Sequence, residues 1–486
     1  MKKYRVLLIT LGVLTAAVVI ALAIAIVNFR PNQSFTTVGT ISDGSGGAIV
    51  AWQNDNGIYV QHLDSAGKLL WQQGGLPVSN VGKIVAPYVL YHTGFSMVSD
   101  GLGGAIIAWA GESAASAKIN NMDNFNPLDI YVQRIGADGA LMWPDTTIAA
   151  GDNWQIVATG DGGVIIAWDN FKPFSEALHD DYLSLQKIAS DGIMLWGNTG
   201  LTLVTSSPFH PTTAEEIANH VPGMYNRTFP TYTGTQDIVS DGAGGVVVIW
   251  DEEGNGTERV FAQRVDNQGN TAWSGNTLVG NGTYQSHSLL TNGSGGAFLA
   301  LQAYNQGVTF RVQVGHDGGL LGVTQYYPYS VGDGSGGNIN CRIQLVQPNA
   351  GSGTIYDTLY VQRLDAAGSP VWPEKQVISS RLGYEIINLQ CTADGSGGIL
   401  MCWQLVKGET ARGVIYVQKA DASGNLLFGT TGTNVFGSAG TWQWCNNLSD
   451  GDGGLFVTAP TGSKVYIQHV GANGSRLWDS GIRLDK

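Results

Sequence analysis

Charged side chains are scarce in this chain. Asp, Glu, Lys and Arg make up 13% of its 486 residues, about half of the usual share of roughly 25%. Acidic residues outnumber basic ones, and the formal net charge is −13. Residues 1–30 hold 4 of the 25 basic side chains and no acidic one, so the remainder carries 21 basic against 38 acidic groups, or −17. A body of that sign repels phosphate backbones, and we expect no nucleic acid partner.

Helical periodicity is also missing, because no long stretch after residue 35 sustains it. Glycine occupies 68 positions, and 43% of the residues are apolar. The apolar share is too high for a disordered chain. Glycine-rich turns between β-branched and aromatic runs are typical of β-structure. The composition therefore predicts an all-β fold.

One long hydrophobic run lies at the N-terminus. Residues 6–27 are 22 consecutive uncharged, largely apolar positions. At about 1.5 Å per residue they span roughly 33 Å, enough to cross a bilayer core. A cleavable secretory signal has a shorter apolar region, but Ala21 and Ala23 leave cleavage open as an alternative.

Basic side chains precede this run and favour a cytoplasmic N-terminus. We therefore predict a cytoplasmic segment over residues 1–5, a single-pass transmembrane signal anchor over 6–27 and a tether over 28–36. The body, residues 37–486, is expected on the extracytoplasmic side of the cell membrane.

An internal repeat fills this body. Its first copy reads DGSGGAIVAW (43–52), IYVQHLD (58–64) and SAGKLLW (65–71). Eight copies share the 456 residues from 31 to 486, or 57 residues each. Each copy offers four strand-like runs, which is how a propeller blade is built. We predict a β-propeller of eight four-stranded blades. Stacked β-sandwiches are the alternative fold, and seven blades the alternative number, because the fifth copy lacks its aromatic residue near Leu320.

The end of each repeat, D-x-x-G-x-x-x-W, resembles the tryptophan-docking motif of quinone-dependent and related eight-bladed propellers, including the outer-membrane assembly lipoprotein. The matching positions are Asp64/Gly67/Trp71, Asp138/Gly139/Trp143, Asp191/Gly192/Trp196, Asp266/Gly269/Trp273, Asp365/Gly368/Trp372 and Gly474/Trp478. The resemblance implies that each Trp packs against the next blade. The quinone enzymes also need adjacent cysteines, which this chain lacks, so we predict no quinone cofactor. The full repeat is also similar to that of uncharacterised bacterial surface propellers.

The repeat predicts two unlike faces. The D-G-x-G-G turn and the D-x-x-G turn are short, and antiparallel strand order places both on one side of a blade. The long, variable connections then share the other side: 110–129, 169–181, 201–236 and 347–357. Binding sites are concentrated on such loops.

Acidic and histidine residues gather in the long connections of repeats two to four. A cation site made from oxygen-rich ligands would favour calcium. The candidate metal ligands are Asp169, Asp180, Asp181, Glu216 and His220. The other candidates for the binding face are His179, His210, Tyr225, Glu252, Trp442 and Trp444, of which the two tryptophans are candidates for stacking on sugar. The alternative without a binding function is a solvated acidic rim with one short surface helix.

Other repeated residues have structural interpretations. The aspartates that open the D-G turns are predicted to close those turns with their own side chains, rather than to bind calcium. The tryptophans that end the second runs, such as Trp52 and Trp109, are predicted to lie in the core. Cys341 and Cys402 occupy a position that carries small residues elsewhere, which suits buried free thiols. Pairing of Cys391 with Cys402 in an oxidising compartment is the alternative.

No catalytic constellation is recognisable, and no cofactor is predicted, although Ca²⁺ is possible. The leading hypothesis is therefore a membrane-anchored scaffold that docks surface proteins by its variable face. The alternatives are a calcium-dependent polysaccharide lyase or glycoside hydrolase, which would need converging carboxylates or a base with a metal, and a carbohydrate-binding adhesin.

Overall fold

The described part of the chain consists of β-strands joined by turns and loops. The computed structural model describes residues 38–54, 57–78, 94–111, 128–144, 146–170, 182–205, 231–254, 257–281, 284–291, 295–303, 309–326, 329–335, 337–346, 356–365, 368–380, 384–407, 413–437, 442–462 and 464–485. These residues contain strands and no helix, which confirms the all-β prediction for them. None of them forms a helix able to cross a bilayer. The predicted cytoplasmic segment (1–5), anchor (6–27) and tether (28–36) lie outside the described residues.

The strands form eight consecutive antiparallel blades of four strands, as the repeat predicts. Blades 1 and 2 contain β1 (Val38–Ser42), β2 (Ala48–Asn54), β3 (Gly57–Leu63), β4 (Leu76–Pro77), β5 (Phe95–Ser99), β6 (Ala105–Gly111), β7 (Leu128–Ile135) and β8 (Thr146–Ala158). Blades 3 and 4 add β9 (Val164–Asn170), β10 (Tyr182–Ile188), β11 (Leu201–Thr205), β12 (Thr231–Ser240), β13 (Val246–Gly254), β14 (Thr257–Val265) and β15 (Thr277–Asn281). The 13-residue β8 is shared, because its first part pairs with β7 and its second part with β9.

The second half of the chain repeats this order. Blades 5 and 6 contain β16 (Tyr284–Thr291), β17 (Ala297–Ala303), β18 (Thr309–Val314), β19 (Leu320–Tyr326), β20 (Tyr329–Gly332), β21 (Asn338–Val346), β22 (Tyr356–Leu364) and β23 (Lys375–Ser379). Blades 7 and 8 contain β24 (Tyr384–Ala393), β25 (Ile399–Lys407), β26 (Gly413–Ala420), β27 (Thr433–Asn434), β28 (Asn446–Ser449), β29 (Leu455–Thr461), β30 (Lys464–Val470) and β31 (Ile482–Arg483). Strands β11 and β12 extend into residues 201–236, which the sequence suggested as one loop.

Because the strands of a blade are antiparallel, successive connections lie at opposite ends of the blade. The turns between first and second strands and between third and fourth strands lie at one end, as in blade 1. We call the surface made by these ends of the eight blades the turn face. The remaining connections leave from the opposite ends, which make up the loop face. The predicted variable connections all start and finish at the loop face.

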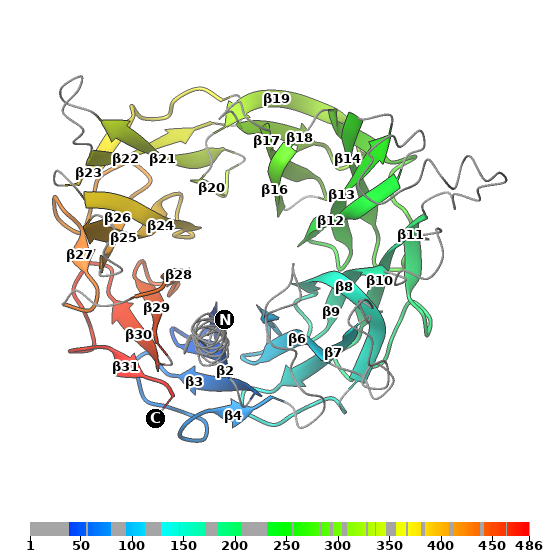
Figure 1. The fold of residues 1–486 in the computed structure, drawn as a ribbon, viewed down its shortest axis with the longest axis horizontal. Coiled ribbons are helices and arrows are strands. Elements are labelled where there is room, and N and C mark those ends of the chain that lie inside the picture. The colour runs from blue at the N-terminus through cyan, green and yellow to red at the C-terminus, as the bar shows by residue number, and fades with distance from the viewer. Residues whose placement is uncertain are drawn as a thin grey trace, which may run out of the picture. The chain divides into compact units, whose positions relative to one another are not determined.

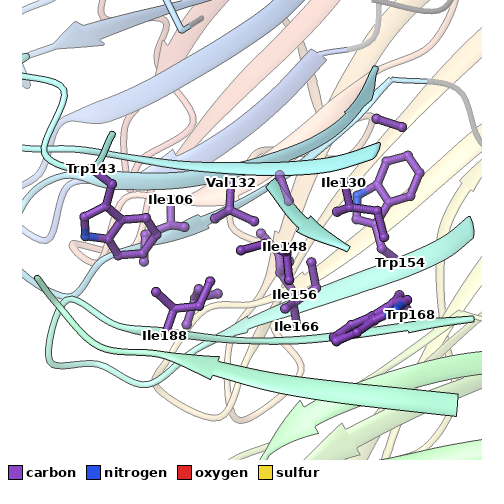
Figure 2. Close-up of a cluster of buried hydrophobic side chains, with 13 residues drawn as sticks. Ile106, Ile130, Val132, Trp143, Ile148, Trp154, Ile156, Ile166, Trp168 and Ile188 are labelled. Carbon is purple, nitrogen blue, oxygen red and sulfur yellow. The ribbon is translucent and has the colours of Figure 1, made fainter. Parts of the chain in front are cut away.

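The second strands of the blades carry a series of deeply buried tryptophans. Trp52, Trp109, Trp168, Trp250 and Trp403 expose at most 1% of their surface, which confirms the predicted core position of this tryptophan series. Apolar side chains of adjacent blades meet face to face. Figure 2 shows this for blades 2 and 3, where Trp143 and Trp168 lie at opposite ends of a cluster rich in isoleucine. Burial of this apolar surface between blades is the main force that holds the propeller together.

In five of the eight blades, a second tryptophan is hydrogen-bonded to the next blade. The indole nitrogen of Trp71 in blade 1 donates to the carbonyl of Ala137 in blade 2 at 3.1 Å. Its ring lies where a Cβ on Gly139 would come within 3.0 Å, so the turn needs glycine there. Trp143, Trp196, Trp273 and Trp372 make the same kind of bond to the following blade.

The last blade packs against the first one. A Cβ on Gly67 of blade 1 would come within 2.7 Å of the Trp478 ring of blade 8. The hydroxyls of Thr40 and Thr458 lie 3.0 Å apart across the same interface. Blades 8 and 1 also share one apolar core cluster. The eight blades therefore close on themselves, and Figure 1 shows them arranged around a centre.

One junction differs from the others. Seven clusters of buried apolar side chains each span two adjacent blades. The junction between blades 5 and 6 has no docking tryptophan, because the fifth repeat reads Leu320–Leu321–Gly322 at that point. Blade 5 is the repeat that lacks its docking aromatic residue, and Leu320 and Leu321 at its turn are 52% and 63% exposed.

Candidate functional site

The D-G-x-G-G turns are closed by their aspartates. Oδ1 of Asp43 accepts hydrogen bonds from the backbone N–H groups of Ser45 and Gly47, both at 2.8 Å. Asp100, Asp241, Asp333, Asp394 and Asp450 repeat this pattern. The turn interpretation of these residues is therefore confirmed.

The second carboxylate oxygen of each of these turn aspartates contacts a basic side chain (His, Arg or Lys) from the third strand. His62 lies 2.9 Å from Asp43, and Arg134 lies 2.9 Å from Asp100. The other pairs are Asp241–Arg264, Asp333–Arg363, Asp394–Lys419 and Asp450–His469. Burial alone would raise the pKa of Asp43, but the bonds from His62, Ser45 and Gly47 outweigh it and lower that pKa.

Sequence reasoning missed these pairs, although the repeat contains the signal. The cation always follows the glutamine of the Y-V-Q run. In the fifth repeat, Asn292 replaces the aspartate and Gln313 replaces the cation, so both charges are absent together. Such a joint replacement is expected for a buried pair, because a lone buried charge is costly.

Basic side chains at this position of the repeat also tie neighbouring blades, including Lys187 of the third repeat, where Thr159 stands in place of the turn aspartate. Arg134 donates to the carbonyl of Ser190 in blade 3 at 2.9 Å. Lys187 donates to Gly244 in blade 4 at 2.7 Å, and Lys419 to Gly453 in blade 8 at 3.0 Å. The buried charges near the turn face therefore serve the cohesion of the propeller.

On the loop face, Asp169 is held by a residue in an unusual conformation. Asn153 has a φ of 49°, and its side-chain amide donates to Asp169 Oδ2 at 2.8 Å. Asn388 repeats this arrangement with a φ of 54° and donates to Gln404 at 2.9 Å. Both asparagines lie where the first strand shifts register against the second. Non-glycine residues at positive φ are uncommon, and such strain is often found at functional sites.

Glu252 lies on the loop-face half of β13. Its Oε1 accepts from the indole nitrogen of Trp250 at 3.0 Å, and its Oε2 lies 3.8 Å from Arg259. The Glu252 carboxylate is therefore oriented by contacts within its own blade. Its predicted role on a binding face stays a prediction.

Trp442 and Trp444 are half-buried and pack onto different cores. Trp442 stacks on Phe436 with ring centroids 4.5 Å apart and meets Tyr466 edge-on. Trp444 packs against the core shared by blades 8 and 1. One ring face of Trp442 is thus occupied by Phe436, and sugar stacking by these residues stays a prediction.

The other sequence-predicted residues lie outside the described part of the chain. They are His179, Asp180, Asp181, His210, Glu216, His220 and Tyr225. Among the described residues, no three His, Cys, Asp or Glu side chains gather in a way that could hold a metal ion. Of the five predicted calcium ligands, the structure describes only Asp169. The calcium site therefore stays a prediction.

Asp237, on the first strand of blade 4, was not singled out from the sequence. Its carboxylate accepts from the backbone N–H groups of Ile238 and Leu289 at 2.8 and 2.9 Å, and Leu289 belongs to blade 5. Burial raises the pKa of Asp237, and the two hydrogen bonds lower it. Burial has the larger effect, so the pKa rises to about 6. Nothing in the sequence around Asp237 marks it, since its burial arises between two blades.

No protein-family model matches the chain, and no curated protein does. Solved structures with a similar fold include prolyl oligopeptidase B from Galerina marginata, bound to a hydrolysis and macrocyclization substrate. It is 11% identical over 94% of this chain and 52% of its own, with a TM-score of 0.40. The chain thus spans about half the length of that peptidase.

Two further structures match this chain over nearly all of their own length. The polysaccharide lyase PL25 ulvan lyase, bound to -[GlcA(1-4)Rha3S]-, is 10% identical over 89% of this chain and 91% of its own, with a TM-score of 0.42. A protein of unknown function from Dyadobacter fermentans is 8% identical over 67% and 92%, with a TM-score of 0.31. Likenesses at this level indicate neither activity nor substrate.

Proposed function

We propose that this chain is a membrane-anchored, extracytoplasmic scaffold protein whose propeller docks partner proteins by its loop face. The observation that carries the proposal is the difference between the two faces. Six of the eight blades have an aspartate bonded to a basic side chain near the turn face, built from repeated residues. The variable connections, by contrast, are attached at the loop face, where one blade can differ from the next without disturbing the repeated contacts.

Charge indicates the kind of partner. Residues 31–486 carry 21 basic and 38 acidic side chains. Opposite charge steers association and suppresses wrong partners, so the docked surface is expected to be basic. Association should weaken as ionic strength rises, because salt screens exposed charges beyond about 10 Å at 0.1 M.

Residues 6–27 supply the proposed anchor, and the described chain begins at Val38, the loop-face end of β1. The test is fractionation of cells that produce the full chain or a variant lacking residues 1–27. We expect the full chain to stay with membranes in high salt and the variant to be released. Release of the full chain by salt would contradict the anchor.

The docking surface is tested by two matched changes. One variant replaces residues 206–230, which connect β11 to β12, by a short Gly-Ser linker. The control variant, Leu70→Ser, changes a side chain at the turn face that is 45% exposed. We expect the first change to reduce in-cell cross-linking to the partner and the second to leave it intact. Equal effects of both changes would overturn the assignment to the loop face.

The position of Asp169 favours a second candidate function, a calcium-dependent lyase or hydrolase. The strained Asn153 holds the Asp169 carboxylate at the edge of the acidic connection 169–181. If that connection binds calcium, Ca²⁺ should raise the melting temperature of the wild-type protein and not that of Asp169→Asn. An unchanged melting temperature of the wild type would remove this candidate.

A further inference from the structure

Four cysteines lie across three consecutive blades. Cys341 is in β21 of blade 6, Cys391 and Cys402 are in β24 and β25 of blade 7, and Cys445 directly precedes β28 of blade 8. All four are reduced thiols. Cys341 and Cys391 belong to the apolar core between blades 6 and 7, whereas Cys402 and Cys445 belong to that between blades 7 and 8.

The two cysteines of blade 7 point in opposite directions. Cys391 pairs in register with Met401, and Cys402 is the next residue along the strand. Because successive side chains of a strand alternate between the two sides of a sheet, Cys391 and Cys402 lie on opposite sides. Each has its thiol neighbour in another blade: Cys391 interacts with Cys341, and Cys402 with Cys445. The sheet geometry therefore disfavours the disulfide within the hairpin that the sequence allowed.

The junction between blades 8 and 1 shows how closely side chains at the positions equivalent to Cys341 and Cys391 approach each other. Thr458 and Cys341 are both the fourth residue of a second strand, and Thr40 and Cys391 are both third from the end of a first strand. Between blades 8 and 1, the hydroxyls of Thr458 and Thr40 lie 3.0 Å apart. Side chains at these two positions thus meet across a blade junction, and a disulfide there needs a Cβ separation of roughly 3.5–4.5 Å.

We propose that Cys341 and Cys391 form a disulfide site that can link blade 6 covalently to blade 7. Cys391 is half-buried and is the thiol that a disulfide oxidant can reach, whereas Cys341 is buried. The Cys391 thiolate attacks the oxidant, one thiol leaves, and a mixed disulfide forms on Cys391. The Cys341 thiolate then attacks the sulfur of Cys391, and the second thiol leaves. Two protein thiols lose two protons and two electrons, and the oxidant gains them as two thiols.

The second cysteine pair serves as an internal control, because its burial should protect it from oxidation. Cys402 and Cys445 are both buried, so neither offers an entry point for an oxidant in the folded protein. Burial raises the pKa of both Cys341 and Cys402, so the two pairs differ in the exposure of Cys391, whose thiolate can start the exchange. Oxidation of the folded protein should therefore remove the Cys341 and Cys391 thiols and leave these two.

The test treats the folded full chain with oxidised glutathione, followed by alkylation and peptide mapping without reduction. We expect a Cys341–Cys391 cross-linked peptide and a loss of two of the four thiols when the chain is titrated unfolded. A Cys391–Cys402 link, a glutathione adduct retained on Cys391, or four remaining thiols would each overturn the proposal.

Matched variants use residues that other blades carry at the same positions. Cys391→Thr copies Thr40, and Cys341→Ala copies Ala51; both should abolish the cross-link. Cys402→Ala, which also copies Ala51, should leave it intact. Oxidation should raise the melting temperature of the wild type and of Cys402→Ala only, since a cross-link restricts the unfolded chain. A loss of two thiols in Cys391→Thr would contradict the assignment.

Discussion

Asp237 illustrates how a single half-buried residue can make stability depend on pH. Its carboxylate accepts two backbone hydrogen bonds, and we find no cationic partner for it among the described residues. The turn aspartates, by contrast, are paired with His, Arg or Lys. Burial therefore favours the protonated form of Asp237, whose pKa rises from 3.8 to about 6.

A group whose pKa is raised by folding binds its proton more tightly in the folded state. Below pH 3.8 both states are protonated, and above about 6 both are charged. The free energy of unfolding should therefore fall as pH rises between these values and then level off. Asp237→Asn removes the charge, but it also turns an amide NH2 toward one of the two backbone N–H groups that the carboxylate accepts from. We therefore expect this variant to lose the pH dependence, which should amount to up to about 3 kcal/mol across this range in the wild type.

The measurement is denaturant unfolding of both proteins from pH 4 to pH 7.5. The difference between the two curves isolates Asp237 from other titrating groups. Parallel curves would show that Asp237 titrates normally.

The Asp100–Arg134 pair supports a second prediction. Both side chains are buried, with 1% and 9% of their surface exposed. Asp100→Asn alone leaves a buried guanidinium without its charged partner, and we expect it to cost about 3–5 kcal/mol. The double variant Asp100→Asn/Arg134→Gln copies Asn292 and Gln313 of the fifth repeat and should be much less destabilised.

A double-mutant cycle by thermal unfolding measures this coupling. If the double variant is as unstable as the sum of both single variants, the two side chains do not act as a pair.

At the scale of one element, the docking turn shows why some glycines are required. Gly139 has a φ of +83° and lies against the Trp71 ring, whereas Gly395 has a φ of +76° and would place a Cβ in open space. Gly395→Ala therefore tests backbone strain alone, at about 1–2 kcal/mol. We expect Gly139→Ala to cost about 1–3 kcal/mol more, because its Cβ displaces the indole. Thermal unfolding of both variants checks this, and equal losses would contradict the docking role.

The sequence predicts the elements well wherever the repeat is intact. Strand number, the buried Trp52 series and the turn aspartates follow from local pattern, since each depends on residues within one repeat. The Asp–cation pairs join two parts of a repeat about 20–35 residues apart, and the joint change in the fifth repeat is the signal that reveals them. The positive φ of Asn153 and Asn388 has no such signal, because it results from a register shift between strands.

At the scale of the whole molecule, the junction between blades 5 and 6 is expected to be the least stable one. Blade 5 lacks the docking tryptophan that ties blades 1 to 4 and blade 6 to the following blade. Regions with fewer buried contacts open more often. Hydrogen exchange should therefore be faster in β16 and β20 than in the first strands of blades 2 and 7. Uniform protection of all first strands would contradict this.

The candidate binding face is the part that the sequence describes least. Repeats predict what is common to all blades, whereas a binding site depends on what one blade has and the others lack. Asp169 and Glu252 were found as candidates from composition alone, and their hydrogen-bond partners became visible only in the fold. Asp237 was missed because burial between blades is a property of the assembled propeller.

The most direct test of the scaffold proposal is lysine cross-linking with mass spectrometry on intact cells. Lys407 and Lys464 lie at loop-face ends of their strands, whereas Lys68 lies in a turn of the turn face, and all three are exposed. The proposal predicts frequent links from Lys407 and Lys464 to one defined partner protein, and few from Lys68. Links made equally from both faces, or no protein partner at all, would contradict it.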